Sequence, residues 1–215
     1  MCLPCALGNP QMTNTLLLLS SPRGAASLST RIATALADRF AAAPGSKVQV
    51  HDLAAEALPH IDPDYAEGRM LPPDQRSAGQ AQAVARAEAL LDELNAADVV
   101  VIASSMINFG PSSILKAWLD HIVWPGRTVA YSETGPKGLL TGKKVYLVIA
   151  SGGIYSVGPA VPHDFQTPYL KYVLGVIGLT DVEVIRVEGH AYGPEAAEKA
   201  ISEALSKVAE VAIAA

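Results

Sequence analysis

The sequence contains little cysteine, few aromatic residues and little charge. Its two cysteines, Cys2 and Cys5, both lie in the first five residues, so no disulfide ties the body of the chain together. This pattern is typical of a reducing compartment, and we predict a cytoplasmic location. A zinc site would need two further ligands, and a redox Cys-x-x-Cys motif should follow a strand and open a helix. We therefore interpret residues 1–13 as a poorly ordered leader and predict no metal site.

Long apolar runs and basic runs are also absent. The longest apolar runs, such as residues 99–103 and 145–150, fall far short of the ~20 residues that a membrane-spanning helix needs. The formal net charge is -5, and no stretch rich in Lys and Arg would attract nucleic acid or an anionic membrane. We expect neither of them as a partner. Residues 1–12 also lack the basic start and apolar stretch of a secretory signal.

What the sequence does have is enough apolar material for a sizeable core. Hydrophobic residues make up 50% of the 215 residues and charged residues 17%. This composition excludes a disordered chain. The length suits one domain, which we place at residues 14–215.

Strand-like and helix-like segments alternate along that domain. Apolar runs predict strands at residues 15–19, 48–53, 98–103, 143–150 and 182–187. Helical spacing and helix-start residues predict helices at residues 27–42, 75–95, 111–122, 165–177 and from 194 onward. Five strands and five helices in strict alternation predict an α/β fold. We expect a doubly wound, five-stranded parallel sheet in the order 2-1-3-4-5, with helices on both faces.

Two segments fit this alternation less well. Residues 58–73 are rich in proline and longer than most connections, so they are either a functional rim or dimer contact, or a plain surface excursion. Residues 125–141 contain three glycines and two prolines. We interpret them as a loop, with a short hairpin as one alternative.

The loop after the first strand has the composition of a phosphate site. In a doubly wound sheet the ligand lies outside the carboxyl ends of the strands, between strands one and three. Residues 20–29 join hydroxyl groups to a helix N-terminus, where free N–H groups and the helix dipole favour an anion. Neither GxxxxGK[ST] nor GxGxxG is present, which disfavours a P-loop or a dinucleotide cradle. The alternative is that Ser27 or Ser29 only caps the helix.

The loops after the third and fourth strands could hold a flat ring. Met106 and Phe109 could flank it, and the Asn108 amide could bond its polar edge. The alternative is that the two apolar side chains close the core. Gly152 and Gly153 would let the backbone approach a ligand closely, or they form an ordinary turn.

Several separated motifs resemble those of the FMN-dependent NADH-azoreductases, which are also quinone reductases. They lie at residues 20–29, 106–109, 131–139, 141–144, 152–153, 167–170, 175–178 and 188–195. The resemblance implies a flavodoxin-like fold and a homodimer with FMN bound at its interface. It also implies NADH or NADPH as the electron donor and a quinone or azo compound as the acceptor.

The same resemblance implies which residues form the site. It assigns FMN binding to Ser20, Ser27, Leu28, Ser29, Met106, Ile107, Asn108, Phe109, Ala150, Ser151, Gly152 and Gly153. It assigns the substrate pocket to Phe109, Tyr131 and Tyr155. The sequence departs from the family pattern in three places. Ser105-Met106-Ile107 stands where the family usually has Pro-Met-Tyr, Leu28 where it often has Gln, and Ser151 where it often has Arg. Backbone donors remain, but the substrate and the choice of nicotinamide are left open.

The predicted chemistry needs no catalytic side chain. The chain has no HExxH motif, no GxSxG motif and no candidate catalytic cysteine, so FMN would carry the redox chemistry. We predict a ping-pong enzyme that accepts two electrons from NAD(P)H and releases the nicotinamide before the quinone or azo compound binds. Two alternatives remain: an electron carrier without a substrate site, and an interaction module that has kept the fold and lost the flavin.

Overall fold

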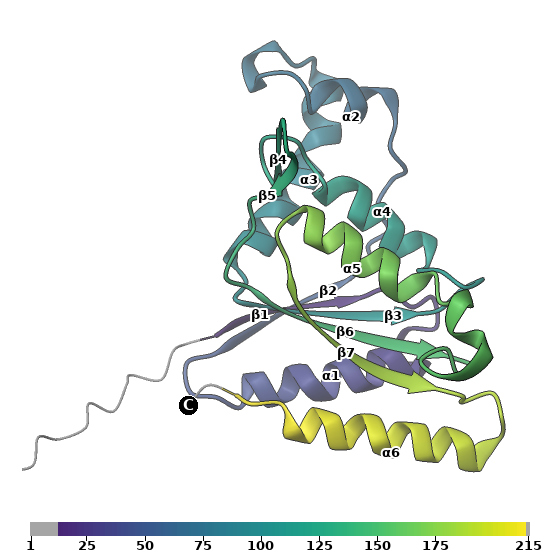
Figure 1. The fold of residues 1–215 in the computed structure, drawn as a ribbon. Helices are drawn as coiled ribbons and strands as arrows, with labels where there is room; N and C mark the ends of the chain where they lie inside the picture. The colour runs from purple at the N-terminus through teal and green to yellow at the C-terminus, as the bar shows by residue number, and fades with distance from the viewer. Residues whose placement is uncertain (1–12, 214–215) are drawn as a thin grey trace, which may run out of the picture.

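The computed structural model describes residues 13–213 and has a parallel sheet between two layers of helices (Figure 1). The strands of the sheet are β1 (Asn14–Leu19), β2 (Lys47–Asp52), β3 (Val99–Ser105), β6 (Lys144–Ser151) and β7 (Asp181–Glu188). They are ordered β2-β1-β3-β6-β7, and every neighbouring pair is parallel. This confirms the predicted fold class, because the order is 2-1-3-4-5 when these five strands are counted along the chain.

Helices cover both faces of the sheet. The helices within residues 13–213 are α1 (Leu28–Ala41), α2 (Pro63–Gly68), α3 (Ala78–Ala96), α4 (Ser113–Ile122), α5 (Gln166–Val176) and α6 (Pro194–Glu210). Short 3-10 helices occur at η1 (Gly24–Ala26), η2 (Pro73–Gln75) and η3 (Gly158–His163). Helices α1 and α6 lie on one face of the sheet, and α3, α4 and α5 lie on the other (Figure 1). No helix within residues 13–213 is both long enough and apolar enough to cross a bilayer.

Side-chain alternation along β3 divides the core in two. Val100 and Ile102 pack in the cluster that contains α3, α4 and α5. Val99 and Val101 pack in the cluster that contains α1 and α6. The strand is apolar at consecutive positions because both of its faces are buried. Successive residues at its carboxyl end must likewise face opposite helical layers.

The prediction of strict alternation was wrong, because α2 lies between β2 and α3. The sequence predicts no element in this proline-rich stretch. Asp62 starts the helix by accepting a hydrogen bond from the Tyr65 N–H at 2.7 Å, and Pro63 takes the first helical position. Tyr65 is buried, and its hydroxyl donates to the His121 carbonyl of α4 at 3.0 Å. This contact between distant parts of the chain anchors the short helix.

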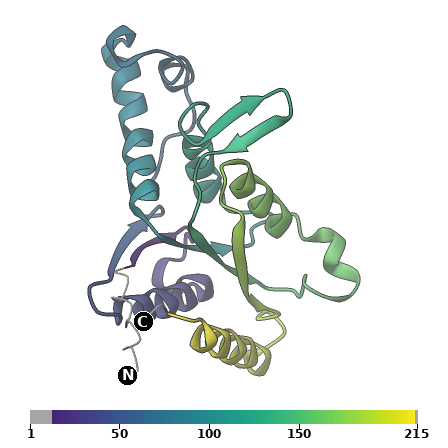
Figure 2. The same cartoon turned by 60° about the vertical axis from the view of Figure 1, so that its left-hand side comes forward.

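A second departure is the antiparallel pair β4 (Val129–Ser132) and β5 (Gly135–Gly138), which confirms the hairpin alternative for residues 125–141. Figure 2 shows the hairpin projecting beyond α5, away from the sheet. Gly138 passes so close to the end of α5 that a Cβ there would lie 2.0 Å from the Gly178 nitrogen. Only glycine fits this crossing.

The end of the third strand and the start of the helix that follows it also differ from the prediction. The predicted third strand ends at residue 103, whereas β3 continues to Ser105 through pairing with β6. Pro111 was expected at the first position of a helix, but α4 starts at Ser113. Ser112 caps it by accepting a hydrogen bond from the Leu115 N–H at 3.2 Å. The predicted leader, with Cys2 and Cys5, lies outside the described residues except for Thr13.

Candidate functional site

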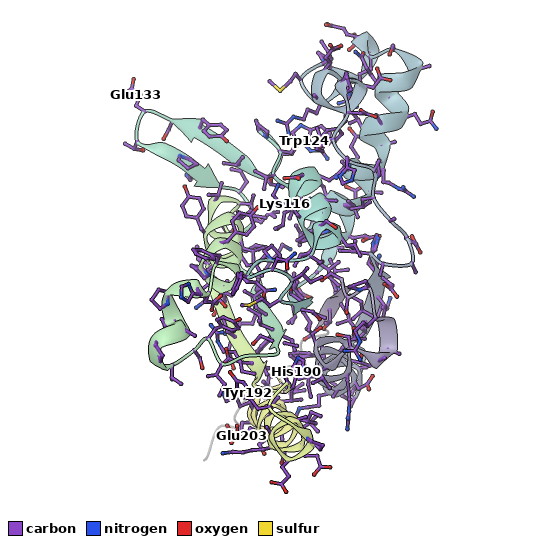
Figure 3. All side chains as sticks on the ribbon, turned by 90° about the vertical axis from the view of Figure 1, so that its right-hand side faces the viewer. Lys116, Trp124, Glu133, His190, Tyr192 and Glu203 are labelled. Carbon is purple, nitrogen blue, oxygen red and sulfur yellow. The ribbon has the colours of Figure 1, made fainter. Side chains whose placement is uncertain are left out.

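A hollow of about 210 Å³ lies at the carboxyl ends of β1, β3 and β6. Figure 3 faces this edge of the sheet and labels His190 beside α1 and α6. The lining contains two basic side chains, Arg23 and His190, and no carboxylate. It is formed by Ser21, Pro22, Arg23, Ser27, Leu28, Ser105, Met106, Ile107, Ala150, Gly152 and His190. This set of side chains suits an anion.

Serine hydroxyls converge beside this hollow. The Oγ atom of Ser27 lies 2.9 Å from that of Ser29 and 3.1 Å from that of Ser105. Ser29 and Ser105 are also 3.1 Å apart, which closes a triangle of three hydroxyls. The Ser105 hydroxyl is also within 3.4 Å of the Ser21 hydroxyl. The triangle brings two serines of the α1 start, Ser27 and Ser29, against the last residue of β3.

The side chain of the residue that precedes α1, Ser27, does not cap the helix. Ser27 occupies the cap position with extended backbone angles, but its hydroxyl makes no capping hydrogen bond. That hydroxyl is held in the triangle instead. The first N–H groups of a helix have no carbonyl partner within the helix, and they carry the positive end of its dipole. The capping alternative for Ser27 therefore finds no support, and the structure offers an anion both hydroxyl and backbone donors.

Ser20 is placed differently from the other predicted phosphate-binding serines. It is fully buried, and its hydroxyl donates to the Ala103 carbonyl at 2.6 Å. Its carbonyl accepts a hydrogen bond from the Ser112 hydroxyl at 3.0 Å. These bonds tie the end of β1 to β3 and to the start of α4. The single proton of the Ser20 hydroxyl is thus already committed to the backbone.

The segment after β3 forms a tight two-residue turn. Ile107 and Gly110 exchange backbone hydrogen bonds of 2.9 and 3.1 Å. The two residues between them, Asn108 and Phe109, have φ values of 48° and 69°. Asparagine tolerates this left-handed conformation, whereas a residue such as phenylalanine costs about 1–2 kcal/mol there. The Phe109 side chain stays half exposed, so it does not close the core.

The segment after β6 is fixed by backbone contacts with residues that follow β7. The Ala191 N–H donates to the Gly152 carbonyl, and the Gly189 N–H is shared between the Ser151 and Gly153 carbonyls, all at 3.1 Å. The buried Ser151 hydroxyl turns inward to the Gly153 carbonyl at 2.9 Å. These bonds bring His190 to the hollow. Sequence reasoning missed His190, although it lies within the matched motif at residues 188–195.

Phe109 also belongs to an aromatic group at the same edge. Its ring centroid lies 6.2 Å from that of Tyr155 in an edge-on arrangement, and 6.4 Å from that of His163. The structure therefore brings together two of the three predicted pocket residues. The third, Tyr131, lies on the β4–β5 hairpin and is 67% exposed. It lines a separate hollow of about 380 Å³ with residues of α4 and α5.

A charged network holds the wall that carries Tyr155. The Tyr155 N–H donates to Glu188 Oε1 at 3.0 Å, and the Ser156 hydroxyl donates to Glu188 Oε2. Arg186 bonds Glu188 Oε1 at 3.0 Å and Asp164 Oδ2 at 2.9 Å. Burial alone would raise the pKa of Asp164. Hydrogen bonds from Thr167 and Arg186 more than offset burial and hold that pKa below its usual value.

One other hollow is less suited to a ligand, and no metal site is seen in the described residues. A larger hollow, of about 420 Å³, lies along the start of β1 and β2 and the end of α3. A doubly wound sheet does not place its ligand at that edge. Within residues 13–213, no three His, Cys, Asp or Glu side chains gather in a way that could hold a metal ion.

Comparison with known proteins shows the family to which the chain belongs. A family model described as having a flavodoxin-like fold matches residues 13–212. The chain is 55% identical over 201 residues to FMN-dependent NADH:quinone oxidoreductase 2 of Rhizobium etli, which covers 93% of this chain and 98% of that protein. It is 56% identical over 194 residues to the FMN-dependent NADH:quinone oxidoreductase of Mesorhizobium japonicum, with 90% and 92% covered.

Solved structures agree with these relatives. The crystal structure of an azoreductase from Bacillus anthracis superposes with a TM-score of 0.85 at 31% identity, covering 93% of this chain and 98% of that one. The structural likeness thus extends over nearly the whole chain.

Proposed function

The chain belongs to the family of FMN-dependent NADH:quinone oxidoreductases, and from this premise we propose that it binds FMN and passes two electrons from NADH to a quinone. The observation that carries the proposal is the group of hydroxyl and backbone donors at the carboxyl edge of the sheet. They converge on a hollow whose lining contains Arg23 and His190 and no carboxylate. A phosphate monoester is the ligand that such a donor set fits.

The residues at this edge suit FMN, and each part of the cofactor has residues that would hold it. Ser27 and the first N–H groups of α1 would hold the phosphate, and Ser29, also predicted to bind FMN, is buried behind them with its hydroxyl 2.9 Å from that of Ser27. The turn at residues 106–109 and the Gly152-Gly153 segment would hold the ring, and Gly152 also lets the backbone pass the Ala191 side chain, whose Cβ would lie 3.2 Å from a Cβ at Gly152. Leu28, Ala150 and Ser151 would contribute backbone groups. Ser20, also predicted to bind FMN, would act through the position of the β1 end, because its hydroxyl faces Ala103.

FMN, when bound, supplies the two-electron chemistry that links nicotinamide to quinone. The chain's own residues bind, orient and exclude water. Phe109 and Tyr155 pack edge-on at the same edge of the sheet, and their rings would offer a surface on which a flat nicotinamide or quinone can stack. We propose that both substrates use this one place in turn, which gives a ping-pong cycle. The azoreductase relative makes azo compounds a second class of acceptor to test.

We propose that the chain acts as a homodimer. Tyr131 and Tyr172 are 67% and 71% exposed and line one apolar hollow beside the hairpin. Exposed apolar patches of this kind mark association surfaces. Tyr131 lies on a separate hollow, apart from the 210 Å³ hollow and from the aromatic group of Phe109, Tyr155 and His163 in its own chain. Its predicted role in the substrate pocket therefore requires the hairpin of a second copy.

A cytoplasmic location stays a prediction from the sequence.

The first test is an absorbance spectrum after incubation with FMN and desalting, followed by NADH in the absence of oxygen. We expect flavin bands that survive desalting and bleach with NADH. Bands that do not bleach would favour the electron carrier, and a colourless protein would favour an interaction module.

A second test addresses the cycle. With NADH and a quinone varied together, we expect parallel reciprocal plots. Intersecting plots would contradict the ping-pong scheme, because they require both substrates on the enzyme at once.

Sedimentation of the wild type and of Tyr131→Ala would test the dimer: we expect a weaker dimer in the variant.

A further inference from the structure

We propose that Ser105 is a further phosphate-binding residue and a determinant of selectivity for FMN over riboflavin. The inference rests on the proposed function, because it concerns the same hollow. The proline that the family usually has at this position carries no donor in its side chain. If Ser105 binds the phosphate, this chain has a contact that the usual pattern lacks.

The first argument is the path of β3. Pairing of Ser104 with Ile149 and of Ser105 with Ala150 extends the strand to its last two residues. In an extended strand these two side chains point to opposite faces. Ser104 accordingly meets α5, where its hydroxyl accepts a hydrogen bond from Gln166 Nε2 at 2.6 Å. Ser105 faces the opposite layer, at the uncapped start of α1.

The second argument is the position of Ser105 within the hydroxyl group. It is within 3.1 Å of both Ser27 and Ser29 and within 3.4 Å of Ser21, so it touches every other member. Ser29 is fully buried and does not line the hollow, whereas Ser105 is partly exposed and does. The Ser105 hydroxyl therefore lies between the buried Ser29 and the hollow.

The third argument concerns hydrogen-bond strength. A serine hydroxyl has one proton and can rotate it to the best acceptor. Hydrogen bonds to charged acceptors are about twice as strong as those between neutral groups. A phosphate in the hollow would therefore draw the Ser105 proton away from its serine neighbours. Ser29 can still donate to the Ser105 oxygen and hold it in place.

The test is the affinity of wild type and Ser105→Ala for FMN and for riboflavin, which lacks the phosphate. Binding is measured from the change in flavin fluorescence. Loss of one hydrogen bond to a charged acceptor predicts FMN binding weaker by roughly tenfold to a hundredfold. Riboflavin affinity should be unchanged. Ser105→Thr, which keeps the hydroxyl and suits a strand, should restore most of the selectivity for FMN.

Ser104→Ala is the matched control, because it removes a hydroxyl from the adjacent residue on the opposite face. It should leave the ratio of the FMN and riboflavin affinities unchanged. The proposal is overturned if Ser105→Ala weakens both flavins equally, since Ser105 would then support the ring-binding turn, or if FMN binding does not change. Failure of the wild type to bind FMN would instead refute the proposed function itself.

Discussion

Arg186 is the residue whose loss tests the charged network most directly. Its guanidinium makes three bonds, to Asp164 Oδ2 at 2.9 Å, to Glu188 Oε1 at 3.0 Å and to Thr167 Oγ1 at 2.9 Å. The Asp164 and Glu188 side chains are only 7% and 9% exposed. Arg186→Met keeps most of the bulk and leaves both carboxylates without their cation.

Removal of one partner from a buried ion pair costs about 3–5 kcal/mol. Arg186 itself is 19% exposed, so water screens part of this cost. We expect Arg186→Met to lower the free energy of unfolding by about 3 kcal/mol at neutral pH. Urea unfolding followed by the fluorescence of the two tryptophans would measure it.

The loss should depend on pH in a definite direction. In the wild type the pKa of folded Asp164 lies below its unfolded value. Its stabilising contribution is therefore complete above the unfolded pKa and is lost as the pH falls through the folded pKa. In Arg186→Met the guanidinium no longer opposes the effect of burial, so the pKa of Asp164 should be higher than in the wild type. Protonation of Asp164 at low pH then removes the unpaired buried charge that destabilises the variant. The difference between the two proteins should thus narrow below about pH 4.

Two results would refute this reasoning. One is a loss below about 1 kcal/mol at neutral pH, which is the size expected of an exposed pair. The other is a difference that stays constant into the acid range. Asp164→Asn keeps the acceptor for the start of α5, so the double variant with Arg186→Met provides a cycle. We expect the double variant to lose less stability than the sum of the single losses.

Three further substitutions test separate features. Gly138→Ala would place a Cβ 2.0 Å from the Gly178 nitrogen and should cost about 3 kcal/mol or more, seen as a large fall in melting temperature; a small fall would mean that the hairpin can move freely. Phe109→Gly should relieve a positive φ that costs about 1–2 kcal/mol, which offsets the added freedom of the unfolded chain and the lost ring contact with Tyr155. Stability in urea should therefore change little while KM for the quinone rises; a loss of more than about 2 kcal/mol would contradict the strain. Thr128→Val should lower stability by about 2 kcal/mol in the same assay, because the buried backbone N–H of Trp124 loses its acceptor. Unchanged stability would contradict this.

The sheet was predictable from the sequence because burial on two faces leaves a plain signal. Segments such as residues 99–103 are apolar at every position, which is typical of a short strand covered by helices on both sides. The end of β3 was harder to predict. Ser104 and Ser105 look like loop residues, but pairing with β6 keeps them in the strand, and partners on distant elements satisfy their hydroxyls.

Helix α2 shows a different limit. Its local signals are present, since Asp62 and Pro63 are typical cap and first-turn residues. A helix of six residues is marginal in water unless it packs against something. The contact that holds it, from the Tyr65 hydroxyl to His121, joins residues 56 positions apart. No local pattern in the sequence encodes such a contact.

The candidate site was predictable in its loops and less so in its individual side chains. The three loops lie at one edge, as the sheet order requires, and Phe109 and Tyr155 lie together. Ser105 and His190 were missed as lining residues, and Ser20 faces the backbone. Which side of a strand end a hydroxyl faces depends on where the strand stops. Tyr131 lies on the β4–β5 hairpin and lines a separate hollow.

The opposite placement of Ser104 and Ser105 sets a limit on how this chain can change in length. Insertion or deletion of one residue within β3 would exchange the faces of its last two side chains. Gln166 and the start of α1 would then each meet the wrong partner, although both serines would still be present in the sequence. A change of length within this strand should therefore not be tolerated, even where every residue type is kept. The chemistry at this edge depends on a residue count as much as on residue identity.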